Sequence, residues 1–139
     1  MILLDTNVLI YAFEPESRFH QWGRETIADA VAGEGAAINA VSLAEICVGD
    51  ADPATVADRV RSWGIEILDI PVAAAEVSAR AIQLYLRRKQ TSMSEARVGV
   101  PLPDFFIGAQ AEIMGWKLAT ADQGRFKTYF PSVEFETPT

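Results

Sequence analysis

Four acidic side chains stand beside apolar segments that are typical of buried strands and helices. A cluster of carboxylates is unstable alone, because like charges raise one another's pKa, and a divalent cation makes it favourable. Mg²⁺ and Mn²⁺ prefer oxygen ligands, and such an ion can generate hydroxide from water or stabilise a departing oxygen. The sequence therefore presents candidate ligands for metal-assisted hydrolysis. They are Asp5, Glu45, Asp104 and Asp122.

Each of these acids also has a purely structural interpretation. Asp5 could cap the helix that follows it, and Glu45 has the capping-box spacing from Ser42. Asp104 could complement a helix dipole, and Asp122 could be an ordinary turn residue. None of the four is specific by itself, so the metal hypothesis depends on their lying together in the fold.

The scarcity of other reactive side chains favours carboxylate chemistry. The 139 residues include one histidine, His20, and one cysteine, Cys47. This excludes an internal disulfide, a multi-cysteine zinc site and a pair of histidines acting as acid and base. With 19 acidic against 12 basic residues and a net charge of −7, the chain does not resemble a broadly basic nucleic-acid binder. RNA would have to bind through metal and a local basic strip.

The elements that must position the acids alternate between strands and helices. That order predicts an α/β fold with a mostly parallel sheet in a single domain, residues 1–139. In such sheets sites form beyond the carboxyl ends of the strands, and all four acids are expected there. We expect strands at 2–4, 36–41, 65–68, 116–119 and 133–135, helices at 18–31, 71–89 and 104–114, and a loop over 90–103.

Basic residues gather in one stretch near the end of the long predicted helix. A solvated helix end with favourable dipole placement explains them, and contact with an RNA backbone beside the acidic pocket is the functional alternative. The candidates are Arg80, Arg87, Arg88, Lys89 and Arg97, joined from the other side by Arg125. No segment is long and apolar enough to span a membrane or to serve as a signal peptide, so we expect a cytoplasmic protein.

Four short motifs, in order along the chain, carry a family resemblance. They are ILLDTNVLI at 2–10, SLAEI at 42–46, PDFFIGAQA at 103–111 and LATAD at 118–122, followed by Phe126. Together they closely resemble PIN-domain proteins, especially the VapC-type toxins of toxin–antitoxin pairs. The resemblance implies a three-layer α/β/α sandwich with a mostly parallel central sheet of four to five strands.

The resemblance also implies a chemistry, an RNA-cleaving endonuclease that uses Mg²⁺ or Mn²⁺. Its metal ligands and catalytic acids would be Asp5, Glu45, Asp104 and Asp122. Thr6, Asn7 and Thr120 would support them, although local turn hydrogen bonding also explains the first two. The implied substrate is structured RNA of the tRNA or rRNA class. The implied partners are a VapB-like antitoxin, which would cover or enter the pocket with a basic side chain, and a second copy in a homodimer.

The sequence departs from the family where many relatives carry a further acid after the Asp122 position. Gln123, Gly124 and Arg125 stand there, which predicts a second metal site that is weak or forms only with substrate. An RNA- or protein-binding module with an impaired metal site is therefore an alternative. A phosphatase of the haloacid dehalogenase type also begins with an acid after the first strand, but it needs a second aspartate where Asn7 stands.

Overall fold

The computed structural model describes residues 1–96 and 99–138. Its centre is a five-stranded sheet in the order β3-β2-β1-β4-β5, with every neighbouring pair of strands parallel. This confirms the predicted fold class. The strands are β1 (Ile2–Leu4), β2 (Ala36–Asn39), β3 (Ile65–Leu68), β4 (Lys117–Ala119) and β5 (Phe135–Glu136).

Helices connect the strands, because parallel strands need long crossovers between them. Within the described ranges, no helix combines the length and apolar character needed to cross a bilayer. The helices are α1 (Thr6–Phe13), α2 (His20–Ala32), α3 (Ala40–Val48), α4 (Val56–Ser62), α5 (Ala73–Arg88), α6 (Met93–Ala96), α7 (Leu102–Met114) and α8 (Gly124–Tyr129), with a 3-10 turn at Pro53–Thr55 before α4.

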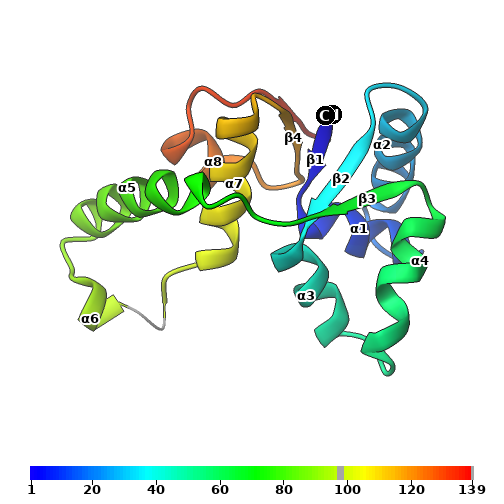
Figure 1. Ribbon diagram of the computed structural model, residues 1–139, viewed down its shortest axis with the longest axis horizontal. Coiled ribbons are helices and arrows are strands. Elements are labelled where there is room, and N and C mark those ends of the chain that lie inside the picture. Colours follow the sequence, from blue (N-terminus) through cyan, green and yellow to red (C-terminus); the bar gives the residue numbers. More distant parts are fainter. Residues whose placement is uncertain (97–98, 139) are drawn as a thin grey trace.

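Alternate residues of β1 enter different cores on the two faces of the sheet. Leu3 packs in a cluster with residues of α5, α7 and α8, whereas Ile2 and Leu4 pack with residues of α1, α2 and α4. Strands buried on both faces are continuously apolar, as this one is. The two cores make the molecule a three-layer α/β/α sandwich (Figure 1).

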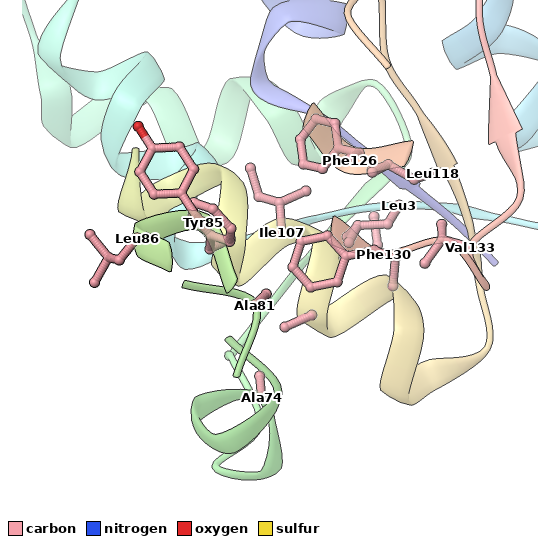
Figure 2. Packing of buried hydrophobic residues seen from close by; sticks show 14 residues of the cluster. Leu3, Ala74, Ala81, Tyr85, Leu86, Ile107, Leu118, Phe126, Phe130 and Val133 are labelled. Atoms are coloured by element: carbon pink, nitrogen blue, oxygen red, sulfur yellow. The ribbon is translucent and has the colours of Figure 1, made fainter. Parts of the chain in front are cut away.

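The core beneath α7 fixes the helix that carries Asp104. Figure 2 shows the ring of Phe130 beside Ile107 and Leu3 in this cluster. A Cβ atom on Gly108 would lie 2.3 Å from the Phe130 ring, so only glycine permits this approach of ring to helix. Close packing here sets the position of α7 against the sheet.

Some element boundaries differ from the sequence-based expectations. The strand predicted over 36–41 ends at Asn39, which caps α3 by accepting a hydrogen bond from the backbone N–H of Ser42. Asn39 is a good N-cap residue, unlike Ala40 and Val41 directly after it, so the helix begins earlier than expected. The stretch 90–103, expected as a loop, contains α6, which lies beyond the end of α5 and away from the sheet (Figure 1). Arg97 falls outside the described residues.

Candidate active site

A pocket of about 200 Å³ brings together the four acids that the sequence singled out. Asp5 follows β1, Asp122 follows β4, and Glu45 and Asp104 project from α3 and α7. The pocket lies beyond the carboxyl ends of the central strands, where open parallel sheets form their sites. Its lining also includes Thr6, Asn7, Ile10, Arg125 and Phe126.

Asp5 is the buried centre of this pocket, with 5% of its surface exposed. It is the N-cap residue of α1, and its Oδ1 accepts a hydrogen bond of 2.8 Å from the backbone N–H of Thr6. Its Oδ2 accepts a hydrogen bond of 2.8 Å from the hydroxyl of Thr120. Burial raises the pKa of Asp5 to about 7, and the charges of Asp104 and Glu45 add to the rise, whereas the two hydrogen bonds oppose it.

Glu45 is oriented by Thr6, not by the start of its own helix. The hydroxyl of Thr6 donates to Oε1 of Glu45 over 2.6 Å. Ser42 Oγ lies 3.0 Å from the same hydroxyl, and because Thr6 has one proton to give, Ser42 donates to Thr6 in turn. The capping-box interpretation of Ser42 and Glu45 is wrong, since Asn39 is the cap.

Thr120 ties the segment after β4 to the centre of the site. Its side chain is fully buried, and its Oγ1 accepts a hydrogen bond of 3.0 Å from the backbone N–H of Asp122. Asn7 lies beside it, with Nδ2 at 3.5 Å from Thr120 Oγ1, and Asn7 Oδ1 accepts from the backbone N–H of Ala121 at 3.3 Å. Asn7 and Thr120 therefore hold the backbone that presents Asp122.

Asp104 is paired with a cation from the same chain. Its Oδ2 lies 2.6 Å from Nη1 of Arg125, and the two side chains are 31% and 40% exposed. Burial raises the pKa of Asp104 and the charge of Asp122 adds to the rise, whereas the hydrogen bond and charge of Arg125 lower it. The sequence predicts an RNA contact for Arg125, and nothing in its pattern indicates this ion pair.

Two buried amides that the sequence analysis overlooked connect the elements of the site. Asn39 Nδ2 donates to Oε1 of Gln110 over 3.0 Å, and Gln110 Nε2 donates to the backbone carbonyl of Asp69 over 3.2 Å. The pair joins the start of α3 to α7, and these helices carry Glu45 and Asp104. The sequence does hold a sign of this pair. Asn39 and Gln110 stand within apolar segments, and a buried amide needs a hydrogen-bond partner.

The donor set fits a hard divalent cation, although the side chains are not gathered around one point. Among residues 1–96 and 99–138, no three Asp, Glu, His or Cys side chains are arranged to hold one metal ion. Glu45 is held by Thr6 and Asp104 by Arg125. Carboxylate oxygens are nevertheless the ligands that Mg²⁺ and Mn²⁺ prefer, and within the described ranges no ion pair neutralises the buried Asp5.

The basic residues of α5 lie outside the pocket lining, whereas Arg125 lies within it. Arg80 is paired with Glu76 at 2.8 Å, and Arg87 is exposed. The Arg88 guanidinium lies 5.9 Å from the centre of the Tyr129 ring, which is on the same helix as Arg125. Lys89 Nζ lies 5.0 Å from the ring centre of Tyr85.

Comparisons with solved structures give matches over almost the whole chain. A VapBC2 structure from Rickettsia felis, bound to a DNA fragment from its promoter, has a TM-score of 0.70 and 19% identity, covering 100% of both chains. A DNA-bound VapBC structure from Salmonella typhimurium has a TM-score of 0.67 and 20% identity, covering 98% of this chain and 96% of the other. A toxin–antitoxin complex from Klebsiella pneumoniae has a TM-score of 0.62 and 24% identity, covering 100% and 98%.

At these identities the solved structures show a shared fold. No curated protein sequence matches the chain. The family comparison is more specific, because the family model described as PIN domain matches residues 2–130 and so includes all four acids of the pocket. The chain belongs to the PIN domain family.

Proposed function

We propose that this protein is a Mg²⁺- or Mn²⁺-dependent endoribonuclease and the toxin of a VapBC-type toxin–antitoxin pair. The observation that carries the proposal is the convergence of four acids from distant parts of the chain on one pocket at the carboxyl edge of the sheet. We propose Asp5, Glu45, Asp104 and Asp122 as metal ligands and catalytic acids. Thr6, Asn7 and Thr120 are their supporting residues.

A bound divalent ion would supply activated water and stabilise charge on a phosphodiester. The protein's contribution is the placement of its oxygens. Thr6 and Thr120 orient the two oxygens of Asp5 from opposite sides, and Thr6 also holds Glu45. Because burial raises the pKa of Asp5 to about 7, this carboxyl would have to give up its proton to hold a cation at neutral or lower pH.

The substrate that we propose is RNA of the tRNA or rRNA class. A chain with a net charge of −7 needs local positive charge to approach a phosphate backbone. Arg125 lies in the pocket lining, and Arg88 borders its helix through Tyr129. Arg80, Arg87, Lys89 and Arg97 are further candidates for outlying contacts.

The proposed partner is a VapB-like antitoxin. The similar solved structures from Rickettsia felis and Salmonella typhimurium are VapBC complexes, and the one from Klebsiella pneumoniae is a toxin–antitoxin complex. By the same family argument we propose a homodimer that works in the cytoplasm.

The test is cleavage of structured RNA by the purified chain, freed of any partner, with and without Mn²⁺. We expect cleavage that requires the cation and falls at least about 100-fold in Asp5→Asn, since even outer partners of metal ligands cost 10- to 100-fold. Asp29→Asn, an exposed acid on α2, is the matched control and keeps full activity. Equal cleavage by Asp5→Asn would refute the site assignment.

A second candidate is an RNA- or protein-binding module without cleavage. It is favoured by one observation, the pairing of Asp104 with Arg125, which leaves the pocket short of a free ligand. Cation-independent RNA binding without any cleavage product in the same assay would support it. The phosphatase alternative gains no support from the family assignment.

A further inference from the structure

Arg125 introduces a positive charge into the acidic pocket. Its Nη1 contacts Oδ2 of Asp104 at 2.6 Å, and it lines the same pocket as Asp5 and Asp122. The pair links α8 to α7, two helices that border the site. Among the described residues, these are the only two side chains of the pocket lining that form an ion pair with each other.

The ion pair takes up an oxygen of Asp104 that a cation could also bind. A divalent ion binding to Asp104 would use its carboxylate oxygens, and one of them, Oδ2, is held by the guanidinium. Two positive groups within a few ångströms of one another repel, and the repulsion is stronger in a partly buried pocket than in water. Arg125 and a divalent cation therefore compete for Asp104.

Once displaced from Asp104, the guanidinium of Arg125 could bind a phosphate group of RNA. Arg125 stands in the first turn of α8 and is 40% exposed, so its side chain can turn outward without moving the helix. A guanidinium fits a phosphate group through two parallel hydrogen bonds, much as it fits a carboxylate. A side chain released from Asp104 would thus meet RNA at the edge of the pocket.

From these contacts we infer that Arg125 is an internal countercharge, which holds Asp104 in the cation-free protein and is released toward RNA phosphate when a divalent cation binds. The inference rests on the proposed function and adds an order of events to it. Cation binding comes first, and the contact of Arg125 with RNA follows.

The first experiment measures cation affinity by titration calorimetry, with Mn²⁺ alone and the full chain at low ionic strength. We expect Arg125→Gln to bind Mn²⁺ about 3- to 5-fold more tightly than the wild type, the upper part of the range for a partly exposed ion pair. Lys127→Gln removes the same charge from the same helix without touching Asp104, and we expect its affinity to stay within about twofold. Thermal melts verify that both variants are folded.

The Mn²⁺ titrations distinguish failure of the countercharge inference from failure of the proposed function. Unchanged or weaker Mn²⁺ binding by Arg125→Gln overturns the countercharge inference and leaves the proposed nuclease standing, because the cleavage assay is separate. Equal tightening by Lys127→Gln also overturns it, since a general charge effect would then suffice. Absence of Mn²⁺ binding by the wild type refutes both the inference and the proposed function.

A second experiment tests the release of Arg125, using tRNA binding in the presence of a chelator. Asp104→Asn and Asp122→Asn each remove one negative charge from the pocket lining, but only Asp104 holds Arg125. We expect tighter tRNA binding by Asp104→Asn, with a salt slope larger by about one, the value for one added phosphate contact. The advantage disappears in Asp104→Asn/Arg125→Gln. Equal binding by the two single variants overturns the release.

Discussion

The side chain of Asn39, at the end of β2, donates a hydrogen bond of 3.0 Å to the side chain of Gln110 on α7. Both residues are fully buried, and Asn39 also caps α3. One contact therefore sets the start of the helix that bears Glu45 relative to the helix that bears Asp104. The geometry of the acidic pocket therefore depends on buried side-chain hydrogen bonds between elements that are distant in sequence.

Replacing Gln110 with Leu leaves the Asn39 amide and the Asp69 carbonyl without their partner. Because unmet buried polar groups are costly, we expect the free energy of unfolding to fall by about 1–3 kcal/mol. Urea unfolding measures the loss, and Gln83→Leu on the exposed face of α5 serves as the control with little change. Equal stability of the two variants would show that the amide pair has no structural role.

The pKa of Asp5 predicts how the stability of the cation-free protein depends on pH. Because this pKa is raised to about 7, the folded state binds the proton more tightly than the unfolded state does. Stability is therefore highest below the ordinary pKa of an aspartate and declines as pH rises toward 7. Between pH 5 and pH 8 we expect Asp5 to account for a loss on the order of 3 kcal/mol, because about 1.4 kcal/mol is lost for each pH unit up to its pKa of about 7.

Urea unfolding in chelator at pH 5 and pH 8 tests this expectation on the wild type and on Asp5→Asn. The variant keeps the size of the side chain and cannot ionise, so its stability should change less between the two pH values. A variant that loses as much stability as the wild type would show that Asp5 does not carry the effect.

Cation binding should release a proton from Asp5 below neutral pH. Since the carboxylate is the ligand, Mn²⁺ affinity is expected to rise with pH and to level off above about pH 7. Calorimetry in two buffers of different ionisation enthalpy counts the released protons. An affinity that is constant between pH 5.5 and pH 8 would contradict the raised pKa.

Removing the hydroxyl of Thr6 should loosen Glu45, which Thr6 holds at 2.6 Å. We expect Thr6→Val to reduce RNA cleavage about 10-fold, as the loss of an orienting partner does at metal sites. Thr128→Val, on exposed α8, removes a hydroxyl that bonds to the carbonyl of Gly124 and serves as the control. Wild-type activity in Thr6→Val would indicate that Glu45 needs no orientation.

Adding a methyl group at Gly108 should force the ring of Phe130 away from α7, since the new atom would lie 2.3 Å from it. Overpacking of this kind costs about 1–3 kcal/mol of unfolding free energy. In Gly108→Ala/Phe130→Leu we expect less than the sum of the two single losses, which a double-mutant cycle measures. Additive losses would show that ring and helix do not meet. Gly49→Ala is the control, because its Cβ would make an ordinary 3.7 Å contact.

The parallel sheet and the shared pocket of the four acids could be predicted, because both follow from apolar strand segments and the acids placed next to them. The apolar run before Asp5 is typical of a buried parallel strand, and sites collect where such strands end. The pairing of Asp104 with Arg125 could not be predicted, since it joins residues 21 positions apart through side-chain rotation. Thr6 is expected to support the acids, but its hydrogen bond to Glu45 could not be predicted, because the spacing of Ser42 and Glu45 fits a local capping box equally well.

The position of Asp5 directly after the central strand β1 has a consequence for synthesis. Its partner Thr120 lies 115 residues further along the chain, and β1 pairs with β4 only when residues 117–119 exist. Contacts so distant in sequence form late in folding. A chain still emerging from the ribosome therefore lacks a complete acidic pocket, and any nuclease activity arises only after residues 117–122 have been made and have joined the sheet.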